Sequence, residues 1–229
     1  MIDNDSCPSP DKDGVHPANG VHPAKGGVYP GDCEFTRALL QKAASRAENQ
    51  QKGYAWRKCL PKAKEVKLLL LDVDGVLTNG SISYTDEGSE MKTFNSRDGF
   101  GMNLLRQAEV EIGLITARSS KALNRRAQDL NLTRVYQGKR NKVAVFEEII
   151  AEMQLTPQQV AYMGDDWLDL ALLTKVGFSA TVADAVPEVI EAVDYVARCP
   201  GGNGAVREVC DLILDAKGLY DKLLGQYLS

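Results

Sequence analysis

The 229-residue sequence lacks an uninterrupted apolar run long enough to span a bilayer, and Met1 is not followed by the basic and then apolar residues of a secretory leader. We therefore expect a cytoplasmic protein with no membrane partner. An excess of basic charge is absent too, because 27 basic side chains stand against 31 acidic ones and the net charge is -4. Nucleic acid is therefore not an expected partner.

Cysteine and histidine are scarce. The five cysteines are odd in number and no two have C-x-x-C spacing, which argues against a disulfide framework or a zinc site and favours reduced thiols. The only two histidines, His16 and His22, lie in residues 1–32, which are rich in Gly, Pro, Asp and Asn and have no apolar periodicity. We interpret these histidines as incidental, with a metal-binding tail as the less favoured alternative.

The N-terminal part of the chain is predicted to be an extension of the folded domain. Residues 1–32 cannot bury enough apolar surface to offset their ordering entropy, so we predict disorder to about residue 32. Residues 33–52 have a helical pattern, and a short basic helix is expected to open at Pro61. Tyr54 and Trp56 are expected to pack on the domain.

Strands and helices are predicted to alternate from residue 67 onward. Apolar runs of strand length occur at 68–71, 111–116, 134–136, 159–163, 178–182 and 195–197. Helical periodicity separates them at 99–108, 119–130, 141–153, 167–175, 187–193 and 204–216. This alternation predicts an α/β fold, a Rossmann-like three-layer sandwich with a central, mostly parallel sheet. Between the first strand and the next helix, two short alternating runs in residues 81–94 predict a small β-hairpin.

Two aspartates follow the first strand directly. Asp72 and Asp74 point to the same side of an extended chain, at the edge where open α/β sheets bind ligands. Two such close carboxylates repel each other unless a cation or a proton lies between them, and a hard divalent metal such as Mg²⁺ prefers oxygen ligands. Asp-x-Asp-Gly is also ordinary turn chemistry, so the pair alone leaves a metal site and a turn equally open.

Three further strand ends carry polar residues that would meet Asp72 at one sheet edge. Each has a structural alternative. Thr116 could be an N-cap, Lys142 a solvated surface lysine, and Asp165 with Asp166 a cap for the helix that follows. Their order and their shared position at strand ends favour a phosphate-binding site.

These residues resemble the four motifs of the haloacid dehalogenase superfamily, at residues 72–78 (Asp-Val-Asp-Gly-Val-Leu-Thr), Thr116, Lys142 and 164–166 (Gly-Asp-Asp). Two further segments, 94–101 (Phe-Asn-Ser-Arg-Asp-Gly-Phe-Gly) and 200–208 (Pro-Gly-Gly-Asn-Gly-Ala-Val-Arg-Glu), are similar to those of its capless subfamily, the 3-deoxy-D-manno-octulosonate 8-phosphate phosphatases. The resemblance covers residues 66–214. It implies an extension over 1–60 and a phosphatase domain with a C-terminal tail over 61–229.

The resemblance implies Mg²⁺-dependent hydrolysis of a sugar-acid phosphate, in lipopolysaccharide precursor synthesis, through an aspartyl-phosphate. Asp72 would be the nucleophile and Asp74 the acid and then the base. Mg²⁺ would be held by Asp72, the main-chain carbonyl of Asp74, and Asp165, with Asp166 supporting that shell. Thr116 and Lys142 would contact the phosphoryl oxygens. The implied substrate-binding residues are Asp74, Asn95, Ser96, Arg97, Asp98, Gly99, Arg118, Arg126 and Lys142.

The hairpin at 81–94 occupies the place where many relatives insert a cap domain. Members of this subfamily close the open site by forming homotetramers in which the hairpins associate and the C-terminal tail reaches the next site. The tail at 219–228 is apolar enough for that role, and packing on its own domain is the equally favoured alternative.

Two departures from the subfamily concern the substrate. Ala117 stands where a Gly is common, and Asn103 where a basic residue is common. A phosphatase for a related nonulosonate 9-phosphate therefore stays open as an alternative. Two other classes are weighed, a non-catalytic oligomerisation module and a phospho-accepting signalling receiver. The intact motifs disfavour the first and Asp74 disfavours the second.

Overall fold

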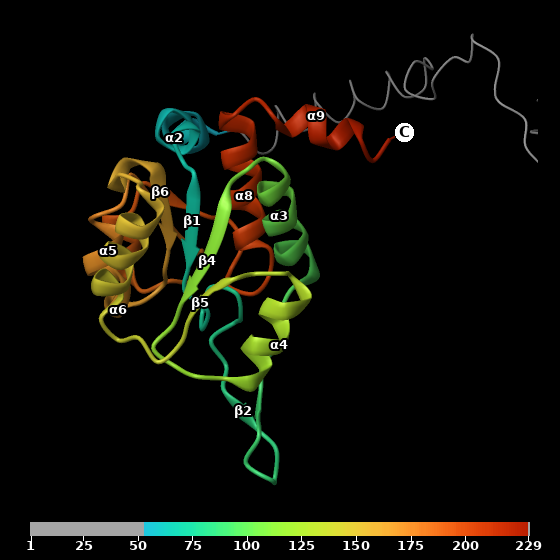
Figure 1. The fold of residues 1–229 in the computed structure, drawn as a ribbon, viewed down its shortest axis with the longest axis vertical. Coiled ribbons are helices and arrows are strands. Elements are labelled where there is room, and N and C mark those ends of the chain that lie inside the picture. The colour runs from blue at the N-terminus through green and yellow to red at the C-terminus, as the bar shows by residue number, and fades with distance from the viewer. Residues whose placement is uncertain (1–52, 229) are drawn as a thin grey trace, which may run out of the picture.

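The computed structural model describes residues 53–228, so the predicted disorder to about residue 32, the predicted helix at 33–52 and both histidines lie outside the described residues. The described chain forms a six-stranded sheet in the order β5-β4-β1-β6-β7-β8, with every neighbouring pair parallel (Figure 1). The strands are β1 Leu68–Leu71, β4 Glu111–Ile115, β5 Arg134–Tyr136, β6 Val160–Met163, β7 Phe178–Thr181 and β8 Tyr195–Val196.

Helices cover both faces of the sheet, as the predicted three-layer sandwich requires. In Figure 1, α5 and α6 lie on one side and α3 and α8 on the other. The helices are α2 Tyr54–Lys64, α3 Ser96–Gln107, α4 Lys121–Asp129, α5 Lys142–Met153, α6 Trp167–Leu173, α7 Pro187–Ala192, α8 Ala205–Ala216 and α9 Tyr220–Gly225, with a 3-10 turn at Pro157–Gln159. Among the described residues no helix is both long enough and apolar enough to cross a membrane.

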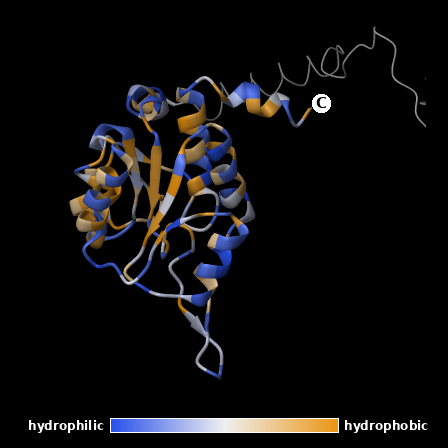
Figure 2. Ribbon diagram, viewed as in Figure 1, coloured by the Kyte–Doolittle hydropathy of each residue, from blue (hydrophilic) through white to orange (hydrophobic). Residues whose placement is uncertain are grey.

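The core lies along β1 and its neighbours. All four leucines of β1 are completely buried, which explains why an apolar run without alternation forms a strand here: helices cover both of its faces. In Figure 2 the central strand β1 is hydrophobic along its length, whereas the helices carry both hydrophobic and hydrophilic residues.

The strand order places a crevice between β1 and β6. From β1 the chain crosses to β4 and β5 on one side, whereas from β6 it proceeds to β7 and β8 on the other. At such a switch point the connections diverge and leave space at the carboxyl ends of the strands, where ligands bind in open α/β sheets. Leu71 is in register with Met163, so the residues that follow them face each other across this crevice.

The predicted hairpin forms, but its strands are short. β2 (Ser83–Tyr84) pairs antiparallel with β3 (Glu90–Met91), and the hairpin projects from the carboxyl end of the sheet (Figure 1). The C-terminal tail contains α9, in which Leu223 is buried, and Tyr227 packs edge-on against Phe100 of α3 with ring centroids 5.4 Å apart. In this chain the tail packs on its own domain, and its contact with a neighbouring site stays a prediction.

The prediction of a short helix opening at Pro61 is wrong. Helix α2 begins at Tyr54 and contains Pro61. Trp56 is buried on the domain, where its indole Nε1 donates a hydrogen bond to Asp215 Oδ2 at 2.8 Å and its ring packs edge-on against Tyr195. Because tertiary burial contributes more to helix stability than intrinsic propensity, this anchor outweighs the proline. Tyr54 is 78% exposed, so the expectation that it packs is wrong.

These two aromatic residues of α2 provide a matched test. We expect Trp56→Ala to lower the free energy of unfolding by about 3–5 kcal/mol, because it removes a large buried side chain and leaves a cavity. Tyr54→Ala should change it by less than about 0.5 kcal/mol, since the ring is exposed. Urea denaturation of both variants measures the difference, and equal losses would show that α2 is not anchored through Trp56.

Candidate active site

The loop after β1 holds Asp72 at the crevice. The Asp72 backbone N–H extends the pairing with β6 by donating to the Met163 carbonyl at 2.9 Å, and its carboxylate Oδ1 accepts from the Val73 N–H at 2.7 Å. Gly75 has φ +88°, and a Cβ there would lie only 2.0 Å from Asp165 Oδ2. The glycine is needed for a positive φ and for the close approach of Asp165. The segment is therefore a turn that lets the carboxylate of Asp165 lie close to the loop that carries Asp72.

Lys142 is a buried partner of Asp72. It is the first residue of α5 and only 3% exposed, so its interpretation as a solvated lysine is wrong. Its Nζ lies 2.9 Å from Asp72 Oδ2 and 2.6 Å from Asp169 Oδ1. Burial alone would lower the pKa of Lys142, but the charges of Asp72 and Asp169 outweigh burial and raise it. Lys142 is thus a fixed cation beside Asp72.

Asp169 and Tyr162 complete this cluster, and neither was predicted as a functional residue. Asp169 is fully buried, and its Oδ1 accepts from Lys142 and from the Tyr162 hydroxyl. Its Oδ2 accepts from the backbone N–H groups of Asp165 and Asp166 at 3.0 and 3.2 Å. The only sequence signal for Asp169 was its place in the first turn of the helix after the Gly-Asp-Asp motif.

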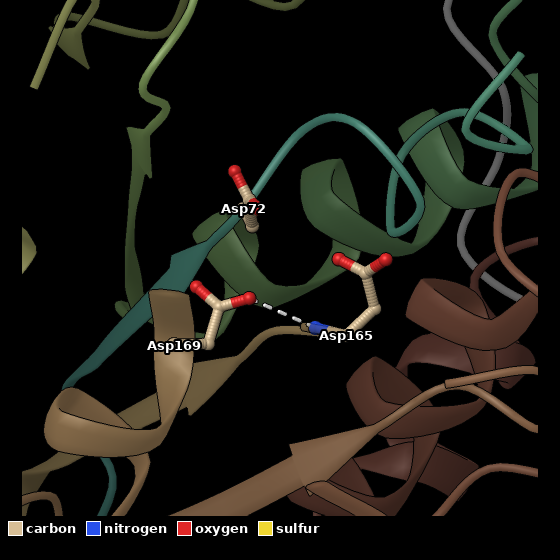
Figure 3. A group of neighbouring side chains, drawn as sticks. All are labelled: Asp72, Asp165 and Asp169. Atoms are coloured by element: carbon tan, nitrogen blue, oxygen red, sulfur yellow. Dashed lines mark hydrogen bonds between the residues drawn. The ribbon is translucent and has the colours of Figure 1, made fainter. Parts of the chain in front are cut away.

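Three carboxylates converge at the crevice. One oxygen of each of Asp72, Asp165 and Asp169 lies within 4.8 Å of the others (Figure 3). Both oxygens of Asp169 are already occupied by hydrogen-bond donors, so this residue orients the others and is not free to bind an ion. Asp165 Oδ1 is buried without a hydrogen-bond partner. An unpartnered buried carboxylate oxygen facing a second carboxylate fits a hard divalent cation held by Asp72 and Asp165.

The electrostatics of the cluster agree with such a fit. Burial raises the pKa of Asp72 to about 6, against the nearby charge of Lys142, which lowers it. Burial, and then the charges of Asp72 and Asp169, raise the pKa of Asp165 to about 7. Both carboxyl groups are unfavourably placed for ionisation in the protein alone, and a divalent cation between them would relieve this.

Thr116 lies at the end of β4 and is 2% exposed. Its hydroxyl accepts from the Arg118 N–H at 3.2 Å, while Ser120 is the residue before α4, so the N-cap alternative for Thr116 is wrong. Asp166, by contrast, does cap α6, accepting from the Trp167 N–H at 2.7 Å. A pocket of about 150 Å³ unites the predicted catalytic and metal residues, lined by Asp72, Asp74, Thr116, Ala117, Arg118, Lys142, Asp165, Asp166 and Leu168.

Asp74 is fixed by side chains from elsewhere in the chain. Its Oδ1 forms an ion pair with Lys92 on the hairpin, a residue to which no role was predicted. Its Oδ2 lies 4.0 Å from Arg118 Nε. The Lys92 side chain is only 2% exposed, and the two-residue strand before it is too short for alternation in the sequence to predict this.

The predicted substrate-binding residues of segment 94–101 do not line this pocket. Asn95 caps α3 by accepting from the Arg97 N–H at 2.8 Å, and Ser96 and Arg97 are exposed in the first turn. Arg126 donates to the Asn95 carbonyl at 3.0 Å and lies against Gly99, where a Cβ would meet it at 2.3 Å.

Asp98 is 1% exposed, and its carboxylate accepts from the backbone N–H groups of Gly204 and Arg207, which caps α8 from outside that helix. This cap holds the glycine-rich loop 200–204. A Cβ on Gly201 would lie 1.8 Å from the Gly75 carbonyl oxygen, and the Gly202 N–H donates to the Val76 carbonyl at 2.9 Å. The loop therefore supports the backbone that presents Asp72 and Asp74.

Known proteins are similar to this chain in sequence and in fold. A family model described as haloacid dehalogenase-like hydrolase matches residues 113–208. The 3-deoxy-D-manno-octulosonate 8-phosphate phosphatase of Escherichia coli strain K12 is 45% identical over 167 residues, which are 73% of this chain and 89% of that protein. The crystal structure of the Yersinia pestis phosphatase of the same name is 43% identical, has a TM-score of 0.70, and is matched over 71% of this chain and 88% of that one.

A further crystal structure, the phosphatase of Moraxella catarrhalis in complex with magnesium ion, phosphate ion and a KDO molecule, is 36% identical with a TM-score of 0.73, over 75% of this chain and 98% of that one. Identity at this level extends over most of each relative. The chain therefore belongs to the 3-deoxy-D-manno-octulosonate 8-phosphate phosphatase family of haloacid dehalogenase-like hydrolases.

Proposed function

We propose that this protein is an Mg²⁺-dependent phosphatase that hydrolyses 3-deoxy-D-manno-octulosonate 8-phosphate to the free sugar acid and phosphate. The observation that carries the proposal is the Asp72 carboxylate, held at the switch point by Lys142 and facing the unpartnered oxygen of Asp165. The name of the Escherichia coli relative and the magnesium, phosphate and KDO of the Moraxella catarrhalis structure support it. As a member of this family the chain is a phosphoric monoester hydrolase.

In the proposed reaction Asp72 attacks the phosphorus atom. A bond forms between its carboxylate oxygen and phosphorus, and the bond from phosphorus to the sugar oxygen breaks. Asp74 gives its proton to that leaving oxygen. Asp74 then takes a proton from water as the water attacks the aspartyl-phosphate, which releases phosphate and regenerates Asp72.

The remaining residues would bind the metal ion and the negatively charged phosphoryl group. Asp72, the main-chain carbonyl of Asp74, and Asp165 would hold Mg²⁺, which when bound would offset the repulsion between the phosphate dianion and the carboxylates. Lys142 and the Thr116 hydroxyl would bind the phosphoryl oxygens. Asp166 would support this shell from the start of α6. Asn95, Ser96, Arg97, Asp98, Gly99, Arg118 and Arg126 remain the proposed substrate-binding set.

Arg118 is the member of that set that lies at the pocket. Its side chain lines the pocket and is 39% exposed, so its guanidinium is placed to contact an anionic substrate. Asn95, Asp98 and Arg126 form hydrogen bonds that hold the loops around the pocket in this structure, and contact of the remaining set with the sugar acid stays a proposal.

The first test is a nucleophile variant. We expect Asp72→Asn to abolish Mg²⁺-dependent phosphate release from the octulosonate 8-phosphate, because an amide does not attack phosphorus as a carboxylate does. Phosphate release is measured with the octulosonate ester and with a nonulosonate 9-phosphate, each with Mg²⁺ and with a chelator. Asp129→Asn, at an exposed residue of α4 outside the pocket, is the control and should retain activity.

Full activity of Asp72→Asn would refute the proposed mechanism. A clear preference of the wild-type protein for the nonulosonate ester would replace the proposed substrate with the alternative that Asn103 suggests. Absence of phosphate release from every ester would support a non-catalytic module instead.

A second prediction concerns pH and metal. In the unfolded chain both carboxyl groups titrate near pH 4, whereas in the folded chain the pKa values of Asp72 and Asp165 are about 6 and about 7. The folded state therefore binds more protons over this window. The two raised pKa values therefore contribute to the free energy of unfolding fully below about pH 4, and this contribution is lost as pH rises through about 6 to 7. Mg²⁺ should raise the melting temperature more at pH 8 than at pH 5.

Asp165→Asn is the matched variant for this test. Removing one buried like charge should make the metal-free protein more stable than wild type at pH 8 and should abolish the shift caused by Mg²⁺. Asp166→Asn, which keeps a helix cap, should retain most of that shift. Thermal melts in chelator and in Mg²⁺ measure both effects, and a full Mg²⁺ shift in Asp165→Asn would exclude it as a ligand.

We also infer a homotetramer, in which the hairpins associate. Ile82, Tyr84 and Met91 of the hairpin segment are 48%, 61% and 54% exposed, an unusual concentration of large apolar side chains on one small projection. Light scattering should give four times the mass of the chain. Ile82→Glu should reduce that mass, whereas Tyr54→Glu, at an exposed aromatic residue of α2, should not. An unchanged mass for Ile82→Glu would place the interface elsewhere.

A further inference from the structure

Lys92 is unusually buried for a residue of a projecting hairpin. Its side chain is 2% exposed, while its neighbour Met91 is 54% exposed. Lysine is rarely buried to this extent unless its charge is paired. Here its ammonium is paired with Asp74 and lies 3.3 Å from Glu90 Oε1. The hairpin thus turns one cation inward to Asp74, which lines the pocket, while Tyr84 and Met91 are exposed.

These pairs are part of a closed ring of four charges. Glu90 Oε1 accepts from Arg118 Nη2 at 3.0 Å, and Arg118 Nε lies 4.0 Å from Asp74 Oδ2. The ring therefore alternates in sign through Asp74, Lys92, Glu90 and Arg118. It connects three segments: the loop after β1, the hairpin, and the loop after β4. Removing one member would leave each of its two neighbours with a single charged partner in place of two.

Within residues 53–228, the ion pairs recorded for the Asp74 side chain come from Lys92 and Arg118 alone. Asp72, in contrast, is held by a backbone N–H as well as by Lys142. Since Lys92 occupies Oδ1, Oδ2 is the oxygen of Asp74 left to exchange a proton inside the pocket. The orientation of this carboxylate is therefore set from the hairpin.

We propose that Lys92 is a positioning residue for Asp74, so that the hairpin contributes to the active site of its own chain. This inference rests on the proposed phosphatase function. Lys92 holds Oδ1 while Oδ2 gives a proton to the leaving oxygen, as the bond between that oxygen and phosphorus breaks. An acid that is free to rotate would miss the leaving oxygen in most encounters.

The leaving group distinguishes this role from a merely structural one. A sugar alkoxide needs a proton as it leaves, whereas p-nitrophenolate is stable without one. A misplaced acid should therefore slow the sugar ester and spare the aryl ester. A general loss of folding or of metal binding would slow both.

The experiment measures kcat/KM of Lys92→Met with the octulosonate 8-phosphate and with p-nitrophenyl phosphate, both in Mg²⁺. We expect a loss of about 100-fold or more for the sugar ester, the usual range for a lost general acid, and a change of at most about threefold for the aryl ester. Lys175→Met, an equal loss of charge at an exposed site far from the pocket, should change neither. Thermal melts and light scattering of each variant report folding and assembly.

Equal losses for both esters, or no loss for the sugar ester, would overturn the positioning role while leaving the proposed function intact. Equal losses with a reduced mass would assign Lys92 to assembly and overturn it as well. If Lys92→Met does not fold, Lys92→Gln takes its place with the same two expected outcomes. Wild-type protein that hydrolyses neither ester would overturn both proposals together.

Discussion

The buried ion pair between Lys142 and Asp72 is the interaction on which the rest of the site depends. Charges are costly to remove from water, and a carboxylate buried without a partner is more costly still. Lys142 compensates Asp72 and Asp169 together, at 2.9 and 2.6 Å, and Tyr162 occupies the same oxygen of Asp169 as Lys142. Asp169 in turn receives the backbone N–H groups that present Asp165. One lysine therefore fixes both the nucleophile and the frame around it.

Negative charge nevertheless remains in excess. Three carboxylates, those of Asp72, Asp165 and Asp169, surround one ammonium, and the raised pKa values of Asp72 and Asp165 express this imbalance. In stability terms the arrangement is unfavourable above neutral pH. In functional terms it is a site prepared for a divalent cation, because a cation is the partner that the unpaired oxygen of Asp165 lacks. Stability is given up where function requires the charge.

The hairpin beside the pocket has two sets of residues, one turned outward and one turned inward. Within residues 53–228 no inserted domain covers the pocket, and the short hairpin projects from the carboxyl end of the sheet (Figure 1). Its outward apolar residues suit association between chains, while Lys92 and Glu90 turn inward to Asp74 and Arg118. The same short hairpin thereby contributes both to the position of Asp74 in the active site and to the association of chains proposed above.

The sequence by itself determined the α/β architecture, nearly all element positions and the four strand ends, because those features depend on local apolar periodicity and on topology rules. It did not determine helix α2 or the partners of the predicted residues. Trp56 anchors α2 through Asp215, 159 residues away, and Lys142 meets Asp169 27 residues along the chain. Lys92 and Asp74 are 18 residues apart. Local sequence patterns do not indicate contacts between residues so far apart in the chain. Only the packed structure therefore decided which charged residues meet in the crevice and which ones stabilise the loops around it.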